Sequence, residues 1–412
     1  MTAETRPLII LVTSGYHLYR EYLLKLVAGA ARVWLLADAE PEWERPYIAG
    51  HTVVDTLDPA AMIEAARAVS AGTPVQGVLC WDEVRMVQSA QVAQALGLPG
   101  GDPEVLGRCR DKHQTREALA AAGVPQASST LVTSVTEARA AADRIGYPVI
   151  VKPRALGASI GVSGVDGPDQ VEAAYQHARG ATEDGVPYYE EWVLVEEYLD
   201  GPEISVDAAC ADGELSPLFV ARKISGFPPH FEEIGHTVDA ADPLLTDAGL
   251  LDVLFAAHQA VGFRNGMTHT ELRLTASGPK VVEINCRLGG DLIPYVGYTA
   301  SGIDPGRVAV QVTCGVRPDV TPTRKRVAAV QFFYPDRDVI VAEVTADPSG
   351  LPPTVDTLGV LAFPGQRLEL PPAGHVACRY AYAVAAADTV EDCMAATQAA
   401  HKAVSLRVRD GS

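Results

Sequence analysis

The sequence predicts an α/β protein of more than one domain, and three observations support this prediction. The chain of 412 residues exceeds the size at which a single hydrophobic core stops growing. Its first hundred residues alternate short apolar runs with segments of helical spacing, which is typical of a parallel sheet. Later segments pair strand-like runs across short turns, which indicates antiparallel hairpins. We therefore expect a doubly wound parallel β-α-β domain at the N-terminus, followed by regions of α+β structure.

The N-terminal domain is predicted from two β-α units. The apolar run 8–12 is followed by helical spacing over 19–30 and by a second strand-like run at 32–38. A further strand near 75–83 precedes a helical segment at 87–97. The first turn lacks the glycine pattern of a dinucleotide-binding fingerprint. We place this domain at residues 1–107.

The rest of the chain reads as a larger middle region and a C-terminal lobe. A helix beginning near 110 is stopped by Gly123 and Pro125. Strand, glycine-rich loop and strand follow within 147–165, two strands and a hairpin turn within 192–215, a helix at 245–262 and a hairpin at 267–286. Short strands and Pro-rich loops then lead to a final alanine-rich helix at 389–405. We expect a middle region at 108–317, with a small lid at about 125–194, and a mixed α+β lobe at 318–412.

Composition excludes several classes of protein. A net charge of -19 argues against a nucleic-acid or membrane-surface binder, because phosphate neutralisation needs clustered Lys and Arg. The seven scattered cysteines form no CxxC pair, so neither a disulfide framework nor a zinc site is indicated. The apolar run at the N-terminus is too short for a signal peptide, and no run is long enough for a membrane span. We expect a cytoplasmic enzyme.

The hairpin at 267–286 carries the strongest chemical signal. With a period of two, His269, Glu271 and Arg273 share one face, and Glu283 and Asn285 share one face with Val281. The opposite face is expected to be core, with Leu272, Val282 and Ile284. Neighbouring carboxylates repel one another unless a hard cation lies between them, which favours Mg²⁺ bound through Glu271, Glu283 and Asn285. The alternative is a solvated sheet face.

The turn after this hairpin offers a cation and a flexible backbone. Arg287 lies two residues beyond Asn285 and would neutralise charge on a transferring phosphoryl group. Gly289 and Gly290 permit close backbone approach to a ligand before Asp291. The alternative is a plain turn with a surface arginine. We assign Arg287 as catalytic and the three residues 289–291, Gly289, Gly290 and Asp291, to the substrate site.

Two other stretches point to a nucleotide. Lys152 precedes a loop with Gly157 and Ser159, and lysine with exposed backbone amides can hold phosphates, although an ordinary glycine-rich turn explains the loop equally well. Lys112 offers a second cation. The stretch at 196–203 ends a strand where free backbone groups can bond an adenine edge and a carboxylate can accept from ribose hydroxyls. Its candidate residues are Glu196, Glu197, Tyr198, Leu199 and Glu203.

In this order the parts resemble the ATP-grasp superfamily of carboxylate-activating ligases. The resemblance rests on Lys112, "VIVKP", the glycine-rich loop, "VEEYLDGPE", "TELRL" and "VVEINCRLGGD", and it covers roughly residues 105–291. It implies that Lys112 and Lys152 contact phosphates, that Glu196 and the backbone of 197–199 bind adenine, and that Glu203 binds ribose. It further implies two Mg²⁺ ions held by Glu271, Glu283 and Asn285, with Mn²⁺ as a substitute, and an acyl phosphate stabilised by Arg287.

The motif "NCRLGGD" is similar to that of the L-amino acid (dipeptide) ligase branch. The chain lacks the Val-Glu-His sequence of biotin-type carboxylases and has no Met-Lys-Met biotinylation sequence. The segment "KISGFPPHFEEIGHTVDA" also resembles the ligases and places Lys223 and His236 near the nucleotide and acceptor sites. His236 would help to remove a proton from the amine or shape its pocket. A structural histidine is the alternative.

The resemblance implies an ATP-dependent ligase that joins a small carboxylate and an amine, both amino-acid-like, through an acyl phosphate. The oligomeric state stays open, although dimers are common among the enzymes that the chain resembles, so a homodimer is one expectation. Two other hypotheses stay open: a carboxylase or formyl-transferring enzyme that uses bicarbonate or formate, and a non-catalytic nucleotide binder. No side chain identifies the acid or the amine.

Overall fold

A parallel sheet forms the N-terminal part of the computed structural model, which describes residues 6–189 and 192–409. Its strand order is β3-β2-β1-β4, and every pairing in it is parallel. The strands are β1 (Leu8–Val12), β2 (Arg32–Ala37), β3 (Gly50–Val53) and β4 (Val75–Cys80), and the helices are α1 (His17–Ala30), α2 (Pro59–Gly72) and α3 (Met86–Ala95). Alternate residues of β1 enter two different cores, one with α1 and one with α2 and α3. The predicted doubly wound parallel arrangement is therefore confirmed.

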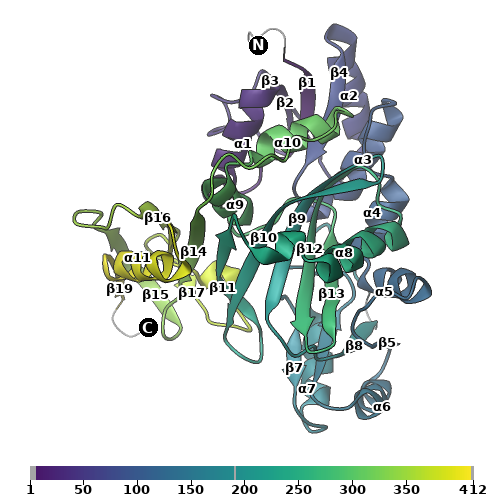
Figure 1. The fold of residues 1–412 in the computed structure, drawn as a ribbon, viewed down its shortest axis with the longest axis vertical. Helices are drawn as coiled ribbons and strands as arrows, with labels where there is room; N and C mark the ends of the chain where they lie inside the picture. Colours follow the sequence, from purple (N-terminus) through teal and green to yellow (C-terminus); the bar gives the residue numbers. More distant parts are fainter. Residues whose placement is uncertain (1–5, 190–191, 410–412) are drawn as a thin grey trace.

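A small antiparallel sheet lies at the opposite end of the molecule (Figure 1). Its order is β5-β8-β6-β7. Its strands are β5 (Ser129–Val132), β6 (Val149–Pro153), β7 (Ser163–Val165) and β8 (Val193–Glu197), with helices α6 (Val135–Ile145) and α7 (Val171–Gly180). Both helices contribute alanines to one shared core with the strands. Helices α4 (Pro103–Arg110) and α5 (Lys112–Ala121) precede this sheet in the chain.

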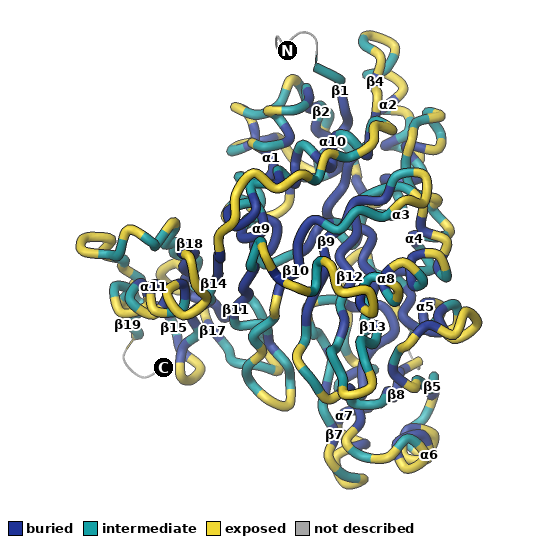
Figure 2. Tube along the Cα trace, in the orientation of Figure 1, coloured by how far each residue is buried: buried dark blue, intermediate teal, exposed yellow. Residues whose placement is uncertain are grey.

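An eight-stranded antiparallel sheet occupies the middle of the molecule, in the order β13-β12-β9-β10-β11-β14-β18-β16. Its strands are β9 (Glu203–Ala211), β10 (Glu214–Gly226), β11 (Glu232–Asp239), β12 (Gly266–Thr275), β13 (Gly278–Asn285), β14 (Val327–Phe333), β16 (Val355–Val360) and β18 (Ala381–Ala387). Helices α8 (Ala248–Val261) and α9 (Ile293–Ser301) pack against it. Its inner strands are dark blue, and therefore buried, in Figure 2. The sheet joins the middle of the chain to the C-terminal lobe.

The C-terminal lobe adds a second, smaller sheet, β17-β15-β19. Its elements are β15 (Val339–Ala346), β17 (Arg367–Leu368), α11 (Val390–Lys402) and β19 (Val404–Val408). The helix predicted to run to residue 405 ends at Lys402, and a strand follows it. The correction has a local reason, because Val404, Leu406 and Val408 alternate with polar residues and pack on the lobe's core, as a strand requires.

One helix returns from the middle of the chain to the N-terminal sheet. Helix α10 (Pro305–Thr313) packs against α1 and β4. The contact is close, since a Cβ at Gly306 would lie 2.7 Å from the backbone nitrogen of Val27. The N-terminal sheet is therefore covered on one face partly by a segment that lies some 200 residues later in sequence.

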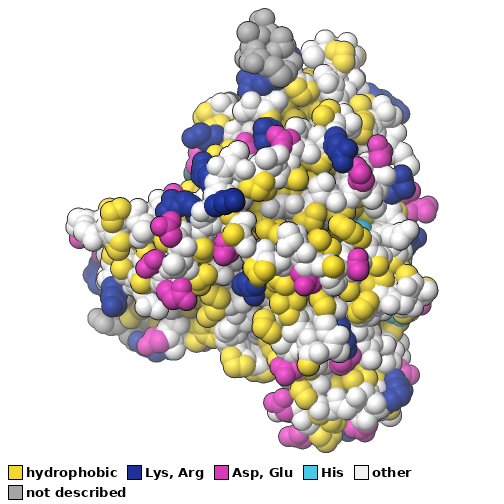
Figure 3. Space-filling view, in the orientation of Figure 1, with side chains coloured by type: hydrophobic (Ala, Val, Ile, Leu, Met, Phe, Trp, Pro, Cys, Tyr) yellow, Lys and Arg dark blue, Asp and Glu magenta, His cyan; other side chains and the backbone are white. Residues whose placement is uncertain are grey.

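On the face shown in Figure 3, Lys and Arg side chains are scattered among Asp and Glu side chains. No helix within residues 6–189 and 192–409 has the length and apolar character needed to cross a membrane. The dense groups of charge that the next section describes lie in the interior instead.

Candidate active site

Two carboxylates face each other across the strands β12 and β13. Glu271 is paired directly with Glu283, and His269 is paired with Asn285. Like charges directly opposite on a sheet repel, and here each carboxylate has its own cation. Lys112 Nζ lies 2.8 Å from Glu283 Oε1, and Lys223 Nζ lies 3.0 Å from Glu271 Oε1. The predicted carboxylate pair is present, and its residues have the oxygen ligands that Mg²⁺ prefers.

A β-bulge corrects the predicted faces of this hairpin. The register shifts so that Leu272 pairs with Val281, which leaves Val282 as the extra residue. Val281 is consequently in the core, whereas Val282, expected there, lines the cleft beside Glu283. The Arg116 guanidinium donates hydrogen bonds to the carbonyls of Val281 and Val282, so the backbone groups freed by the bulge are satisfied.

A cleft lies between the small sheet and the end of the central sheet. It encloses about 890 Å³, including open solvent at its mouth. Eleven of the residues predicted from sequence line it. They are Lys112, Lys152, Gly157, Ser159, Glu196, Glu197, Tyr198, Leu199, Glu203, Glu271 and Glu283. Residues from four separate stretches of sequence thus meet in one space that is large enough for a nucleotide.

Glu196 is the most enclosed charge of the cleft. Its side chain is 4% exposed and accepts two hydrogen bonds from Arg116, at 2.7 and 2.9 Å, while Lys152 Nζ lies 2.6 Å away. Burial alone would raise the pKa of this carboxyl, but Arg116 and Lys152 hold it well below its usual range. Sequence reasoning missed Arg116, although it lies one helical turn after Lys112 on α5.

The start of α5 places Lys112. Asp111 caps the helix by accepting hydrogen bonds from the backbone N–H groups of His113 and Gln114. Asp111 also pairs with Arg154, which follows β6. Lys112 in addition donates to the carbonyl of Leu156 at 2.6 Å. These bonds tie the helix to the strand and loop that carry Lys152.

Lys223 lies at the centre of three carboxylates. Its ammonium is 3.2 Å from Glu203, 2.6 Å from Glu233 and 3.0 Å from Glu271, and its side chain is 1% exposed. One oxygen from each of these acids lies within 4.8 Å of the others. Burial opposes the charge, but the three acids raise the pKa of Lys223 well above its ordinary value. Lys223 itself lies behind the cleft wall rather than on it.

The stretch after β8 leaves backbone groups free for a ligand. The N–H of Glu197 is already bonded to the carbonyl of Ser128, and its carboxylate pairs with Lys280. Within the described residues, Tyr198 and Leu199 make no such backbone bonds, so they are the segment's available groups. The ring of Phe231, from the loop before β11, lies 6.2 Å from the Tyr198 ring and also lines the cleft.

Arg287 links the end of β13 to the N-terminal domain. Its Nε lies 2.7 Å from Glu83, which follows β4. Asn285, predicted as a metal ligand, is 6% exposed on the same strand end. Glu83 was not predicted as a site residue, because nothing in its local sequence distinguishes it from a helix-capping acid.

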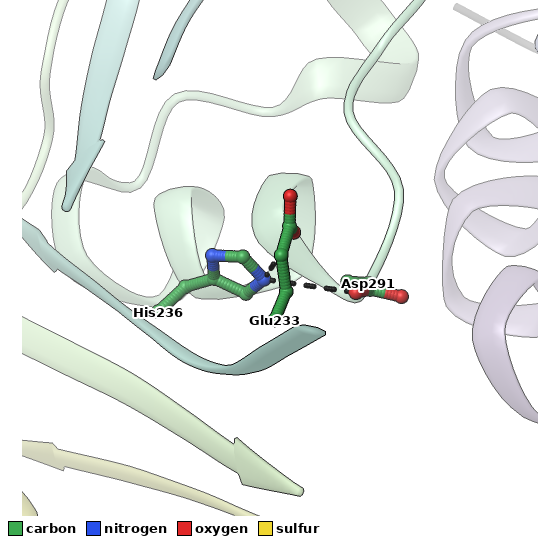
Figure 4. Close-up of side chains that lie close together, drawn as sticks. All are labelled: Glu233, His236 and Asp291. Carbon is green, nitrogen blue, oxygen red and sulfur yellow. Dashed lines mark ion pairs between the residues drawn. The ribbon is translucent and has the colours of Figure 1, made fainter. Parts of the chain in front are cut away.

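A second group of charges lies beyond Arg287, around His236 on β11. Figure 4 shows the His236 ring directed between Glu233 and Asp291. Its Nε2 is 3.2 Å from Glu233 and 3.8 Å from Asp291. Burial disfavours the charged ring, but the two carboxylates outweigh it and raise the pKa of His236. The three groups converge on one point, where a cation would be stabilised.

Arg379 of the C-terminal lobe fixes Asp291. Both terminal nitrogens of the guanidinium donate to the Asp291 carboxylate at 2.7 Å, and Nε donates to the Tyr334 hydroxyl. The guanidinium also lies 3.8 Å from the centre of the Phe332 ring. Asp291 has a φ of +48°, a strained conformation for a residue with a side chain. The bidentate pair holds it there.

A buried pair, Asp207 and His269, contacts the turn at residues 289–291. His269 Nδ1 lies 2.5 Å from Asp207, whose other oxygen accepts a hydrogen bond from the backbone N–H of Gly289. Burial opposes protonation of the ring, but Asp207 and Glu271 raise the pKa of His269 to about 9. A Cβ at Gly289 would lie 2.8 Å from His269 Nδ1. Glycine is therefore required at position 289, where the turn passes close to the Asp207–His269 pair.

Comparisons with known proteins identify the domains of the chain. Residues 145–295 match a model of the ATP-grasp domain, and residues 24–100 match a model of the ATP-grasp N-terminal domain. The solved L-amino acid ligase from Bacillus licheniformis is similar in structure, with a TM-score of 0.80 at 19% identity over 98% of this chain and 99% of that one. At that identity the likeness is one of fold.

Two relatives in sequence are named as ligases. Alanine–anticapsin ligase from Bacillus subtilis is 27% identical over 57% of this chain and 52% of its own length. Phosphoribosylamine–glycine ligase from Mycobacterium leprae is 35% identical over 57% of this chain and 62% of its own length. The chain thus spans between half and two thirds of these relatives.

Proposed function

Because this chain belongs to the ATP-grasp superfamily, we propose that it is an ADP-forming ligase that joins a carboxylate to an amine. One observation carries the proposal: Glu271 and Glu283 face each other in the wall of a cleft that Lys112 and Lys152 also line. Opposed carboxylates beside ammonium groups are what a metal-bound triphosphate requires. The names of the relatives support amino acids as the substrates.

The chain's own residues have distinct tasks in the proposed reaction. Lys112 and Lys152 bind the phosphates, and Glu196 keeps Lys152 in place. The substrate carboxylate attacks the γ-phosphoryl group and displaces ADP, and the amine then attacks the acyl carbon of the resulting acyl phosphate and displaces phosphate. Glu271, Glu283 and Asn285 would hold Mg²⁺, which would supply electrostatic stabilisation of the phosphates. Arg287 neutralises the charge on the acyl phosphate.

The amine is placed beside His236 in this proposal. An ammonium group is stabilised by Glu233 and Asp291, and His236 lies between them to receive a proton as the amine attacks. Closure of the small sheet over the nucleotide keeps water from the acyl phosphate. The backbone of Tyr198 and Leu199 binds the adenine, Glu203 binds the ribose, and Gly157 and Ser159 cover the phosphates.

Further features belong to the same proposal. They are two Mg²⁺ ions with Mn²⁺ as a substitute, a homodimer, a cytoplasmic location, and the division of the chain at residues 107 and 317. Light scattering of the purified protein tests the dimer, and activity with each metal tests the cofactor.

The experiment is phosphate release from Mg-ATP with L-amino acids offered singly and in pairs, followed by mass spectrometry. We expect release that needs a pair, and a product whose mass is the sum of the two less water. Glu283→Gln should abolish both signals, and Glu214→Gln, an exposed acid on β10, should change neither. Release with bicarbonate or formate and no amine would instead favour a carboxylase or formyl-transferring enzyme.

A further inference from the structure

Arg20 on α1 differs from the other arginines around the site. The other arginines around the site each pair with a carboxylate, at distances of 2.6 or 2.7 Å; they are Arg116, Arg154, Arg273, Arg287 and Arg379. Arg20 has no carboxylate within 4.0 Å among the described residues. In the described part of the chain, its Nη1 donates a hydrogen bond to the carbonyl of Gly289, at 3.2 Å, and the Tyr22 hydroxyl lies close to the guanidinium. It is a cation of the site without a counter-ion.

The surroundings make this lack costly. Arg20 is partly buried. Burial is the main cause that lowers its pKa, and the positive charge of Arg287 lowers it further, against the opposing effects of Tyr22, Asp291 and Asp207. A partly buried guanidinium beside a second one is stabilised by a directly bound anion. The Tyr22 hydroxyl nearby is also buried and lacks a hydrogen bond of ordinary geometry. Both groups are suited to a ligand oxygen.

The position of Arg20 identifies the kind of anion. A guanidinium presents a planar fork of donors that matches a carboxylate. Arg20 is not among the residues that line the nucleotide cleft, so the phosphates of ATP are bound by other residues, Lys112 and Lys152. The turn 289–291 begins at Gly289, which Arg20 contacts, and ends at Asp291, which lies beside His236. A ligand that places an ammonium group near Asp291 and a carboxylate near Gly289 must carry both groups in one small molecule, as an amino acid does.

We propose that Arg20 binds the carboxylate of the amine-donating substrate, which is therefore an amino acid with a free carboxylate. This inference rests on the proposed ligase function. The N-terminal domain then selects the acceptor, and its own helix α1 provides the group that does so.

The test compares each acceptor amino acid found in the paired screen with its carboxamide, which keeps the amine and lacks the charge. We expect the wild-type protein to prefer the amino acid by about 10- to 100-fold in kcat/KM, as charged hydrogen bonds imply. Arg20→Gln should remove that preference through the KM of the acceptor, with the KM of ATP unchanged. Arg20→Lys should keep part of it.

Arg6→Gln is the matched control. Arg6 likewise donates only to backbone carbonyls, those of Ala28 and Gly29 at the far end of the same helix, about 12 Å along the helix axis from Arg20. It should keep the wild-type preference. A melting-temperature shift caused by the amino acid in the presence of Mg-ADP is a readout that needs no turnover, and Arg20→Gln should abolish it.

The outcomes separate the two proposals. Amide formation with an unchanged preference in Arg20→Gln would overturn the role of Arg20 and leave the ligase function intact. If no pair forms an amide, the ligase proposal fails. The melting shift then decides on Arg20 alone: an amino-acid shift lost in Arg20→Gln supports the anion site, and a shift retained in Arg20→Gln, or absent in the wild-type protein, overturns it.

Discussion

The nucleotide cleft differs from the second charged region of the site in how it is built. We call this second region the junction, and it includes Glu83, His236, Arg287, Asp291 and Arg379. The cleft takes its ionic groups from within the middle of the chain, as in the contact of Lys152 with Glu196. The junction joins distant parts of the chain, because Asp291 pairs with Arg379 and Arg287 pairs with Glu83. The cleft is therefore a property of one region, whereas the junction exists only when three regions are assembled.

This difference predicts that variants in the two regions affect different substrates. Variants in the cleft should impair the use of ATP, and variants in the junction should impair the use of the amine and the attachment of the lobe. Three measurements test this separation, and a fourth concerns a buried group outside both regions.

The largest effect is expected from Glu271→Gln. The change removes one of the two opposed carboxylates and leaves Lys223 with two acids instead of three. We expect ADP formation to fall by about 10³-fold, since metal and phosphate positioning contribute several kcal/mol to such reactions. A coupled assay of ADP release measures it, with Glu214→Gln as the exposed control. A loss of less than tenfold would remove Glu271 from the proposed metal site.

Arg379→Met tests the junction. It leaves the strained, half-buried Asp291 without its bidentate partner, so we expect a loss of about 3 kcal/mol in unfolding free energy and about 100-fold in kcat/KM for the amine. The KM of ATP should stay within about twofold. Urea unfolding and steady-state kinetics measure these quantities. Arg407→Met removes an exposed pair in the same lobe and should change stability by less than about 1 kcal/mol. An equal rise in the KM of ATP would contradict the separation.

Glu196→Gln tests the cleft in the same way. Arg116 and Lys152 lose the charge that both of them contact, which should raise the KM of ATP about tenfold and leave the KM of the amine unchanged. Kinetics with each substrate varied in turn will show the difference. A rise in the KM of the amine would mean that the two regions are coupled.

The smallest effect concerns His258, a buried group outside both regions. Its Nδ1 donates to the carbonyl of Leu254, Nε2 accepts from Thr268, and burial lowers its pKa to about 4. The unfolded chain binds the proton near pH 6.5 and the folded chain does not, so stability must fall as the pH is lowered through this range. Between pH 7 and 5.5 we expect a loss of about 1 kcal/mol. Urea unfolding at both pH values should show that the stability of the wild-type protein changes by about 1 kcal/mol more unfavourably over this range than that of His258→Gln, because groups such as His269 contribute equally to both proteins.

Sequence patterns predicted the cleft better than the junction, for a physical reason. Strand periodicity and turn residues located the hairpin of β12 and β13 and brought Glu271 opposite Glu283, and the ATP-grasp fold predicted from the ordered motifs is confirmed. The bulge at Val282 was missed because a period of two holds only without an inserted residue. The roles of these residues stay predictions.

The junction was largely invisible because its partners are remote in sequence. Arg379 lies 88 positions from Asp291, in a stretch that carries no motif. Arg20 looked like one helix arginine among others, since the absence of a counter-ion is a property of three-dimensional surroundings. Of the junction residues, His236, Arg287 and Asp291 were predicted, and all three lay in motifs that resembled the ligases.

The return of α10 to the N-terminal sheet has a consequence for how the protein is made. Gly306 contacts α1, yet it leaves the ribosome some 200 residues after the N-terminal domain is complete. At 5–20 residues per second this interval is roughly 10 to 40 s. During that time the apolar surface of the first domain that α10 will cover remains exposed. The nascent chain is then most exposed to aggregation and most dependent on chaperones.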